Sequence, residues 1–173
     1  MTTLRIMQPP LLPSEVLRRV CRLARFDGMS ILVFAGGFAV ISAASHEAPS
    51  AMVGLAVAGA GALELHGLGL LNHYDSRGTR WLVASQAYLM VVMVSYAMFR
   101  LMHPDIAELR PVVTEELAAQ IREVGLTIDQ FLLEFVRVVY AGVAAASMLY
   151  QGGMMLYYLR RRKAIEAAMF EDA

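Results

Sequence analysis

The stretch that decides the fold is AMVGLAVAGAGALELHGLGLL, residues Ala51–Leu71. As a helix it is long enough to cross the hydrocarbon core of a bilayer, which takes about 20 residues. It is apolar except for Glu64 and His66, whose side chains point about 200° apart on a helix and so cannot form one site on that helix. Because a charge in hydrocarbon is costly, we expect Glu64 either to hold a proton or to meet a partner on another helix.

Three more apolar runs surround this one. The chain of 173 residues is 58% hydrophobic with a mean hydropathy of +0.53, whereas soluble domains are about 45–50% apolar. A basic start and the letters SAAS at Ser42–Ser45 resemble a secretory signal, but the leading segment is long for one, so we expect the first run to be retained. The sequence predicts an all-α integral membrane protein, a single domain over 1–173 with spans at 29–45, 51–72, 81–102 and 130–159.

The basic residues predict the orientation of these spans. Membrane proteins carry an excess of Lys and Arg in cytoplasmic segments. With four spans, most of the basic residues fall on one side, in the N-terminal segment 1–28, the loop between the second and third spans, and the tail 160–173. The opposite side has three arginines and many acids. We therefore expect a multi-pass protein of the inner membrane with both termini in the cytoplasm.

Two short helices are predicted outside the spans. Residues 14–26 have the pattern of a basic amphipathic helix at the headgroups, with Ser14 as N-cap and a hinge at Asp27–Gly28. The alternative is a plain extension of the first span. In the extracytoplasmic segment 103–128, residues 114–124 predict a short helix that stops at Gly125. Thr127–Gln130 then reads as a capping box that starts the fourth span.

The depth of Glu64 narrows its partners. A helix rises 1.5 Å per residue, which places Glu64 and His66 in the inner half of the membrane. The polar residues at that depth are Ser85, Gln86 and Tyr88 on the third span and Ser147, Tyr150 and Gln151 on the fourth. We predict a polar layer there, with Glu64, His66, Ser147 and Gln151 as its candidate transport residues. The alternative is that these groups only hold helices together.

The fourth span carries a polar face of its own. Its polar residues recur at spacings of three and four, which puts them on one side of a helix; they include Gln130, Glu134, Arg137, Tyr140, Ser147 and Gln151. Glu134 and Arg137 can pair with each other near the outer boundary, and they are further candidate transport residues. Such a face turns toward protein or water rather than lipid, although interhelical packing explains it equally well.

Small residues predict where helices meet. Gly54, Ala58 and Ala62 follow one another at four-residue steps, on a face that continues to His66. Glycines also mark the first and fourth spans. This small-xxx-small pattern brings helices close together in membranes. Because it offers more contact faces than one four-helix protomer needs, we expect a homo-oligomer.

A homo-oligomeric ion channel or transport protein is the function that these patterns favour. In a ring of protomers, the first span would place an acid at its outer end and arginines at its inner end, as in selective pores. The stretch GGFAVISAASHE, Gly36–Glu47, resembles the pore helix of Orai calcium channels, which also have four spans with both termini inside. The resemblance covers about a dozen residues and implies Glu47 as the entry acid, although His46 departs from the pattern. The alternative reading of Glu47 is a solvated loop residue.

An accessory or anchor subunit of a larger membrane complex is the alternative function. HYDSRGTRWL, His73–Leu82, resembles a stretch of succinate dehydrogenase anchors, but Trp81 stands where that family has its haem-ligating histidine, so we expect no cofactor. No nucleophile motif or metal-ligand spacing such as H-E-x-x-H occurs, and we expect neither an enzyme nor a metal site. The net charge of zero gives no general attraction to nucleic acid. The expected partners are membrane lipids and further copies of the chain.

Overall fold

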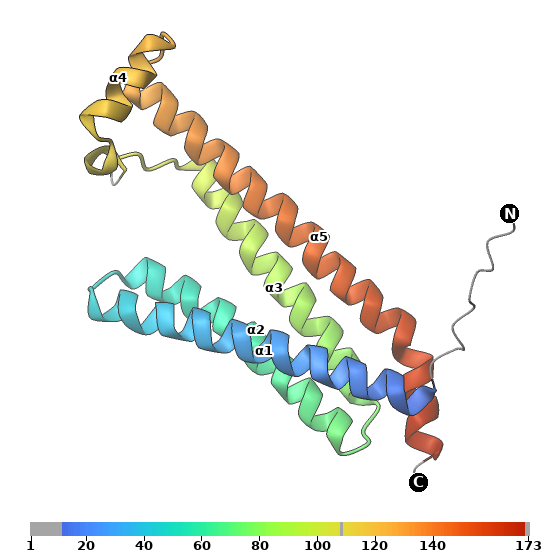
Figure 1. The fold of residues 1–173 in the computed structure, drawn as a ribbon. Helices are drawn as coiled ribbons and strands as arrows, with labels where there is room; N and C mark the ends of the chain where they lie inside the picture. Colours follow the sequence, from blue (N-terminus) through green and yellow to red (C-terminus); the bar gives the residue numbers. More distant parts are fainter. Residues whose placement is uncertain (1–11, 108, 172–173) are drawn as a thin grey trace, which may run out of the picture.

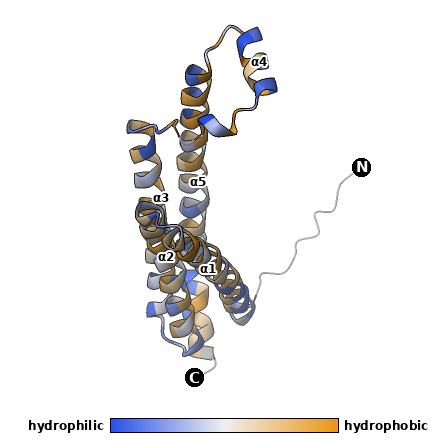
Figure 2. Ribbon diagram, turned by 90° about the vertical axis from the view of Figure 1, so that its left-hand side faces the viewer, coloured by the Kyte–Doolittle hydropathy of each residue, from blue (hydrophilic) through white to orange (hydrophobic). Residues whose placement is uncertain are grey.

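The computed structural model describes residues 12–107 and 109–171, and all regular structure in these ranges is helical (Figure 1). Four long helices are α1 (Pro13–Ala44), α2 (Ala48–Asn72), α3 (Arg77–Met102) and α5 (Ile128–Glu171). Between the last two lie a short 3-10 helix, η1 (Arg110–Val112), and α4 (Glu115–Glu123). Each of the four long helices is long and apolar enough to cross a membrane. The described structure is thus all-α with four candidate membrane spans, as the sequence predicts. Apolar colours dominate these helices in Figure 2, and polar colours gather on α4 and at the turns.

Tight turns fold the first three helices into an antiparallel series. Ser45–Glu47 joins α1 to α2, and His73–Ser76 joins α2 to α3. Each turn contains one residue in the left-handed region, His46 at φ 61° and Tyr74 at φ 58°. This conformation reverses the chain within a few residues.

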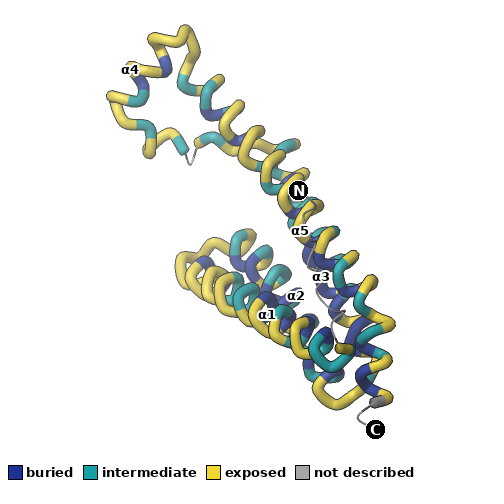
Figure 3. The backbone as a smooth tube through the Cα atoms, turned by 45° about the vertical axis from the view of Figure 1, so that its right-hand side comes forward, coloured by how far each residue is buried: buried dark blue, intermediate teal, exposed yellow. Residues whose placement is uncertain are grey.

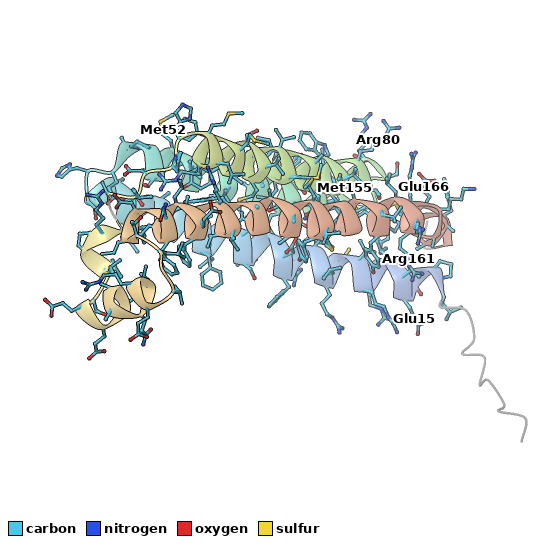
Figure 4. The ribbon with its side chains drawn as sticks, turned by 90° about the horizontal axis from the view of Figure 1, so that it is seen from above. Glu15, Met52, Arg80, Met155, Arg161 and Glu166 are labelled. Atoms are coloured by element: carbon cyan, nitrogen blue, oxygen red, sulfur yellow. The ribbon has the colours of Figure 1, made fainter. Side chains whose placement is uncertain are left out.

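The four long helices form two pairs that diverge from a common base. The α1–α2 hairpin leans away from the α3–α5 pair, as Figures 1 and 3 show. At the base, the start of α1 packs against the end of α5. We call this the basal end of the bundle. Its apolar core consists of Val16, Val20, Ala24, Leu71, Leu82, Met154, Tyr158, Ile165 and Met169. Figure 4 shows Arg80, Arg161 and Glu166 toward the basal end and Met52 at the opposite, distal end.

The predicted break between an interfacial helix and the first span is wrong. α1 runs without interruption through Asp27 and Gly28, both of which are buried. Its first residue is Pro13, so Ser14 lies inside the first turn instead of capping it. Gly28 does not interrupt the helix. It lets α2 approach, because a Cβ at this position would lie 3.3 Å from the carbonyl oxygen of Gly61. The alternative of a plain extension of the first span is therefore the observed one.

The short helix and the start of α5 follow the predicted capping signals. The side chain of Thr114 accepts a hydrogen bond from the Leu117 backbone N–H, and the segment after α4 turns at Gly125 with φ 76°. At the start of α5, the Thr127 side chain accepts a hydrogen bond from the Gln130 backbone N–H at 3.3 Å, and the Gln130 side chain accepts one from the Thr127 backbone N–H at 3.1 Å. This reciprocal pair is the predicted capping box.

The small residues of α2 pack on a face that differs in part from the predicted one. Gly54 and Ala58 are buried as expected, but Ala62 is exposed, and the buried face continues through Gly61 and Glu64. Two helices that wind around each other repeat their contacts about every 3.5 residues, so steps of four soon leave the interface.

Gly61 lies where α1 and α2 are in close contact, and it gives a direct test of their packing. A Cβ on Gly61 would lie 2.7 Å from the Gly28 oxygen and 2.8 Å from the Leu32 nitrogen, both of them backbone atoms. Gly61→Ala is expected to destabilise the protein by about 1–3 kcal/mol, because the two helices must separate. Gly69, on the same helix, has nothing within 4 Å of such a Cβ. Gly69→Ala should therefore be neutral or stabilising, since alanine favours helix by up to about 1 kcal/mol.

Thermal unfolding of both variants in one detergent compares these effects. Equal unfolding midpoints for Gly61→Ala and Gly69→Ala would show that α1 and α2 have room for a methyl group at Gly61.

Candidate functional site

Glu64 lies at the centre of a polar cluster where all four long helices meet. Its side chain is fully buried, with 0% of the residue exposed. Its Oε1 atom accepts a hydrogen bond from the Tyr158 hydroxyl of α5 at 2.7 Å. Its Oε2 atom accepts one from the Gln86 amide of α3 at 3.0 Å. Both oxygens of a carboxyl group in the middle of an apolar helix are therefore satisfied by other helices.

A second carboxyl group, Asp27 of α1, belongs to the same cluster. Its Oδ2 atom accepts a hydrogen bond from Gln86 Nε2 at 2.9 Å. Its Oδ1 atom accepts one from the Tyr150 hydroxyl of α5 at 2.8 Å. Gln86 Nε2 thus uses both of its N–H groups, one on each acid, and bridges Asp27 to Glu64.

The five residues form a chain of hydrogen bonds that runs from the surface to the core. Tyr150 is 51% exposed, Asp27 is 9% exposed, and Glu64 and Tyr158 are fully buried. The order along the chain is Tyr150, Asp27, Gln86, Glu64 and Tyr158. We call these five residues the acid cluster.

The acid cluster lies nearer to the basal end of the bundle. Glu64 lies sixteen positions after Ala48, where α2 begins, but only eight positions before Asn72, where it ends. At 1.5 Å per residue, the cluster is about 12 Å from one end of α2 and about 24 Å from the other. Arg160 follows Tyr158 by two residues and is exposed. Basic side chains therefore begin within one helical turn of the cluster.

The acid cluster contains two acids and no base. Among the described residues, neither Asp27 nor Glu64 forms an ion pair with an arginine, lysine or histidine. Two ionised carboxyl groups in one buried site repel each other, and each loses its hydration. Entry of a single proton or cation relieves both costs.

The donor set of the cluster favours a proton or a hard cation. Carboxyl, hydroxyl and amide oxygens suit such ions rather than soft metals. The Oε1 atom of Gln86 is buried and receives no hydrogen bond from the described protein groups, so one further acceptor is available. Within the described ranges, no three His, Cys, Asp or Glu side chains gather as metal ligands. The arrangement therefore fits the uptake of one small ion that does not need a full set of carboxylate, thiolate or imidazole ligands.

The structure separates the other predicted site residues from Glu64. His66 is exposed, and its ring packs edge-on against Trp81 with centroids 4.9 Å apart. Ser147 and Gln151 are buried on α5, but neither is hydrogen-bonded to the two acids. Glu47 is exposed at the turn between α1 and α2.

The predicted pair on α5 forms at the distal end. Glu134 and Arg137 are bonded at 2.6 Å, and their side chains are 64% and 54% exposed. The Arg100 guanidinium of α3 lies over the Tyr140 ring, 5.5 Å from its centroid. Because Arg100 is near the end of α3, Glu134 and Arg137 lie level with or beyond that end, and their pair is exposed.

Comparison with known proteins gives no information on the function of this chain. No protein-family model, no curated protein and no solved structure matches the sequence or the fold. The acid cluster, the exposed helix faces and the charge pattern are the features of the chain that bear on function.

Proposed function

We propose that this protein is a small inner-membrane transport protein that self-associates and moves protons or another small cation by way of Asp27 and Glu64. The observation that carries this proposal is the acid cluster, which holds two acids without a counter-charge. A cluster built only for packing would not need a second acid beside the first, since one acid and its donors already satisfy each other. A pair of acids that shares one ion is a means of binding and releasing it.

The position of the cluster supports a role in translocation. Tyr150 is exposed at the side of the bundle and donates to the buried Asp27, whereas Glu64 and Tyr158 are fully buried. An ion that enters at Asp27 would then pass to Glu64, the second acid that Gln86 Nε2 holds beside it. With the arginine-rich basal end on the cytoplasmic side, as the positive-inside rule predicts, the cluster would exchange its ion with the cytoplasm about 12 Å from the membrane surface.

The exposed glycines support self-association. A Cβ on Gly36 or Gly37 of α1, or on Gly142, Gly152 or Gly153 of α5, would meet nothing within 4 Å. In a membrane helix such residues favour contact with a second helix, because the two backbones come close together. A second copy of the chain would cover these faces and complete an enclosed path around the cluster. The alternative occupant is a different protein, in which case the chain is an accessory subunit.

Reconstitution into liposomes tests the proposal. With pyranine trapped inside and a potassium diffusion potential set by valinomycin, liposomes that contain the protein should acidify faster than empty ones. The same vesicles with a sodium-sensitive dye test Na⁺ as the cation. If neither ion moves faster than through protein-free bilayers, the transport proposal is wrong and the accessory role gains support.

The mass of the assembly in nanodiscs tests the self-association. A ring of five or more chains would indicate a central pore, and a dimer would indicate a carrier enclosed by two protomers. A strictly monomeric protein would contradict self-association.

A further inference from the structure

A row of arginines borders a cavity at the basal end, apart from the acid cluster. Arg18, Arg22 and Arg25 follow one another at steps of four and three, which puts them on one face of α1. A cavity of about 330 Å³ lies between this face and the end of α2, where Asn72 and Tyr74 complete its wall. The residues that line it are Leu17, Arg18, Cys21, Arg22, Arg25, Leu71, Asn72 and Tyr74.

An apolar hollow continues from this cavity along the same helix. It has a volume of about 520 Å³ and shares Arg22 and Arg25 with the cavity. Its remaining wall consists of Phe26, Met29, Ser30, Val33 and Phe34, most of them apolar and exposed. The hollow therefore begins at two cations and runs along the outside of the bundle toward its distal end.

The arginines of this row are not neutralised by any acid that the structure describes. Within the described part of the chain, none of the three donates a side-chain hydrogen bond or forms an ion pair. No acid lines the cavity or the hollow. All three side chains are exposed. Their positive charge is thus available to an anion from outside the chain.

We propose that this track binds one anionic phospholipid, with its phosphate between Arg22 and Arg25 and an acyl chain along Phe26, Met29 and Val33. Basic pockets beside membrane helices on the cytoplasmic side bind anionic lipid headgroups. A soluble phosphate would use the arginines alone and would leave the apolar hollow without a role. A zwitterionic lipid would fill the hollow but would bring a cation to the arginines. Charge and apolar track together select an anionic lipid.

A titration of the purified full-length protein by native mass spectrometry tests this proposal. Dioleoyl phosphatidylglycerol is the probe, and dioleoyl phosphatidylcholine is the zwitterionic comparison. Arg22→Gln/Arg25→Gln is expected to weaken the tightest phosphatidylglycerol site about 30-fold. Each arginine near an anionic headgroup strengthens binding by about five- to sixfold, and the two effects multiply. Arg77→Gln/Arg80→Gln removes the same charge from the same end of the bundle and should leave that site within about twofold.

Three outcomes would overturn the proposal. An equal loss in both double variants would show a diffuse charge effect in place of a site. Equal binding of phosphatidylcholine would show that the arginines do not select the lipid. Displacement of the lipid by millimolar glycerol phosphate, together with unchanged binding by Met29→Gln, would assign the cavity to a soluble anion.

Discussion

Glu64→Gln is expected to abolish the ion flux through reconstituted liposomes. Glutamine keeps the length and shape of the side chain but neither takes up a proton nor balances a cation. The acid cluster would then hold Asp27 alone, and an ion that reaches it would have no second acid to move to. Flux at the level of protein-free liposomes is the expected result.

The fold should survive this substitution, which makes the loss of flux interpretable. The amide oxygen of a glutamine at position 64 can still accept from Tyr158, but its NH₂ group would face the N–H of Gln86. One hydrogen bond is lost, at a cost of about 1 kcal/mol. The thermal midpoint in detergent should fall only slightly, and the assembly mass in nanodiscs should remain that of the wild type. Dissociation of the assembly would instead assign Glu64 to packing.

Glu134→Gln is the matched control for this experiment. It makes the same chemical change on an exposed acid that forms an ion pair with Arg137. Exposed pairs one turn apart contribute at most about 0.5 kcal/mol, so neither flux nor stability should change appreciably. If Glu134→Gln and Glu64→Gln reduce the flux equally, the acid cluster is not the transport site.

The partner of Glu64 on the third span, Gln86, could be predicted from the sequence. The depth of a residue in a helix is proportional to its distance along the chain from the turn. Two antiparallel spans joined by a short turn keep their register, and Gln86 lies at the depth that the count from that turn indicates. The partner on the fourth span is displaced by about two turns, from Ser147, Tyr150 and Gln151 to Tyr158. α5 is about 65 Å long, far more than a bilayer needs, so its apolar pattern does not show where it crosses.

Asp27 was missed as a site residue because it lies between an arginine-rich segment and an apolar one. An acid followed by glycine at such a boundary resembles a hinge. The spacing of the residues before Asp27 indicates its position better. Val20, Ala24 and Asp27 follow at steps of four and three on one buried face of α1, so an uninterrupted helix places Asp27 inside the bundle. A buried acid needs hydrogen-bond donors, and those of Asp27 are Gln86 and Tyr150. Both are distant in sequence, so only the folded structure identifies them as its partners.

Gln86→Leu is expected to be the most destabilising single change in the acid cluster. Leucine has a similar volume but no donor, so Asp27 Oδ2 and Glu64 Oε2 each lose the N–H that now bonds them. Leaving a buried polar group without its partner costs about 1–3 kcal/mol, and more when it is charged. With two such groups, the expected loss in the free energy of unfolding is about 2–6 kcal/mol.

Gln151→Leu makes the same substitution on another buried glutamine. It should leave the free energy of unfolding unchanged or raise it. Gln151 is 7% exposed, and its buried Oε1 receives no hydrogen bond from any described group. Replacing it by an apolar side chain removes an unsatisfied acceptor, which is neutral or stabilising. Thermal unfolding of both variants in the same detergent measures the difference. If Gln151→Leu proves as damaging as Gln86→Leu, the bridge between Asp27 and Glu64 is not what makes Gln86 necessary, because loss of any buried amide would have the same effect.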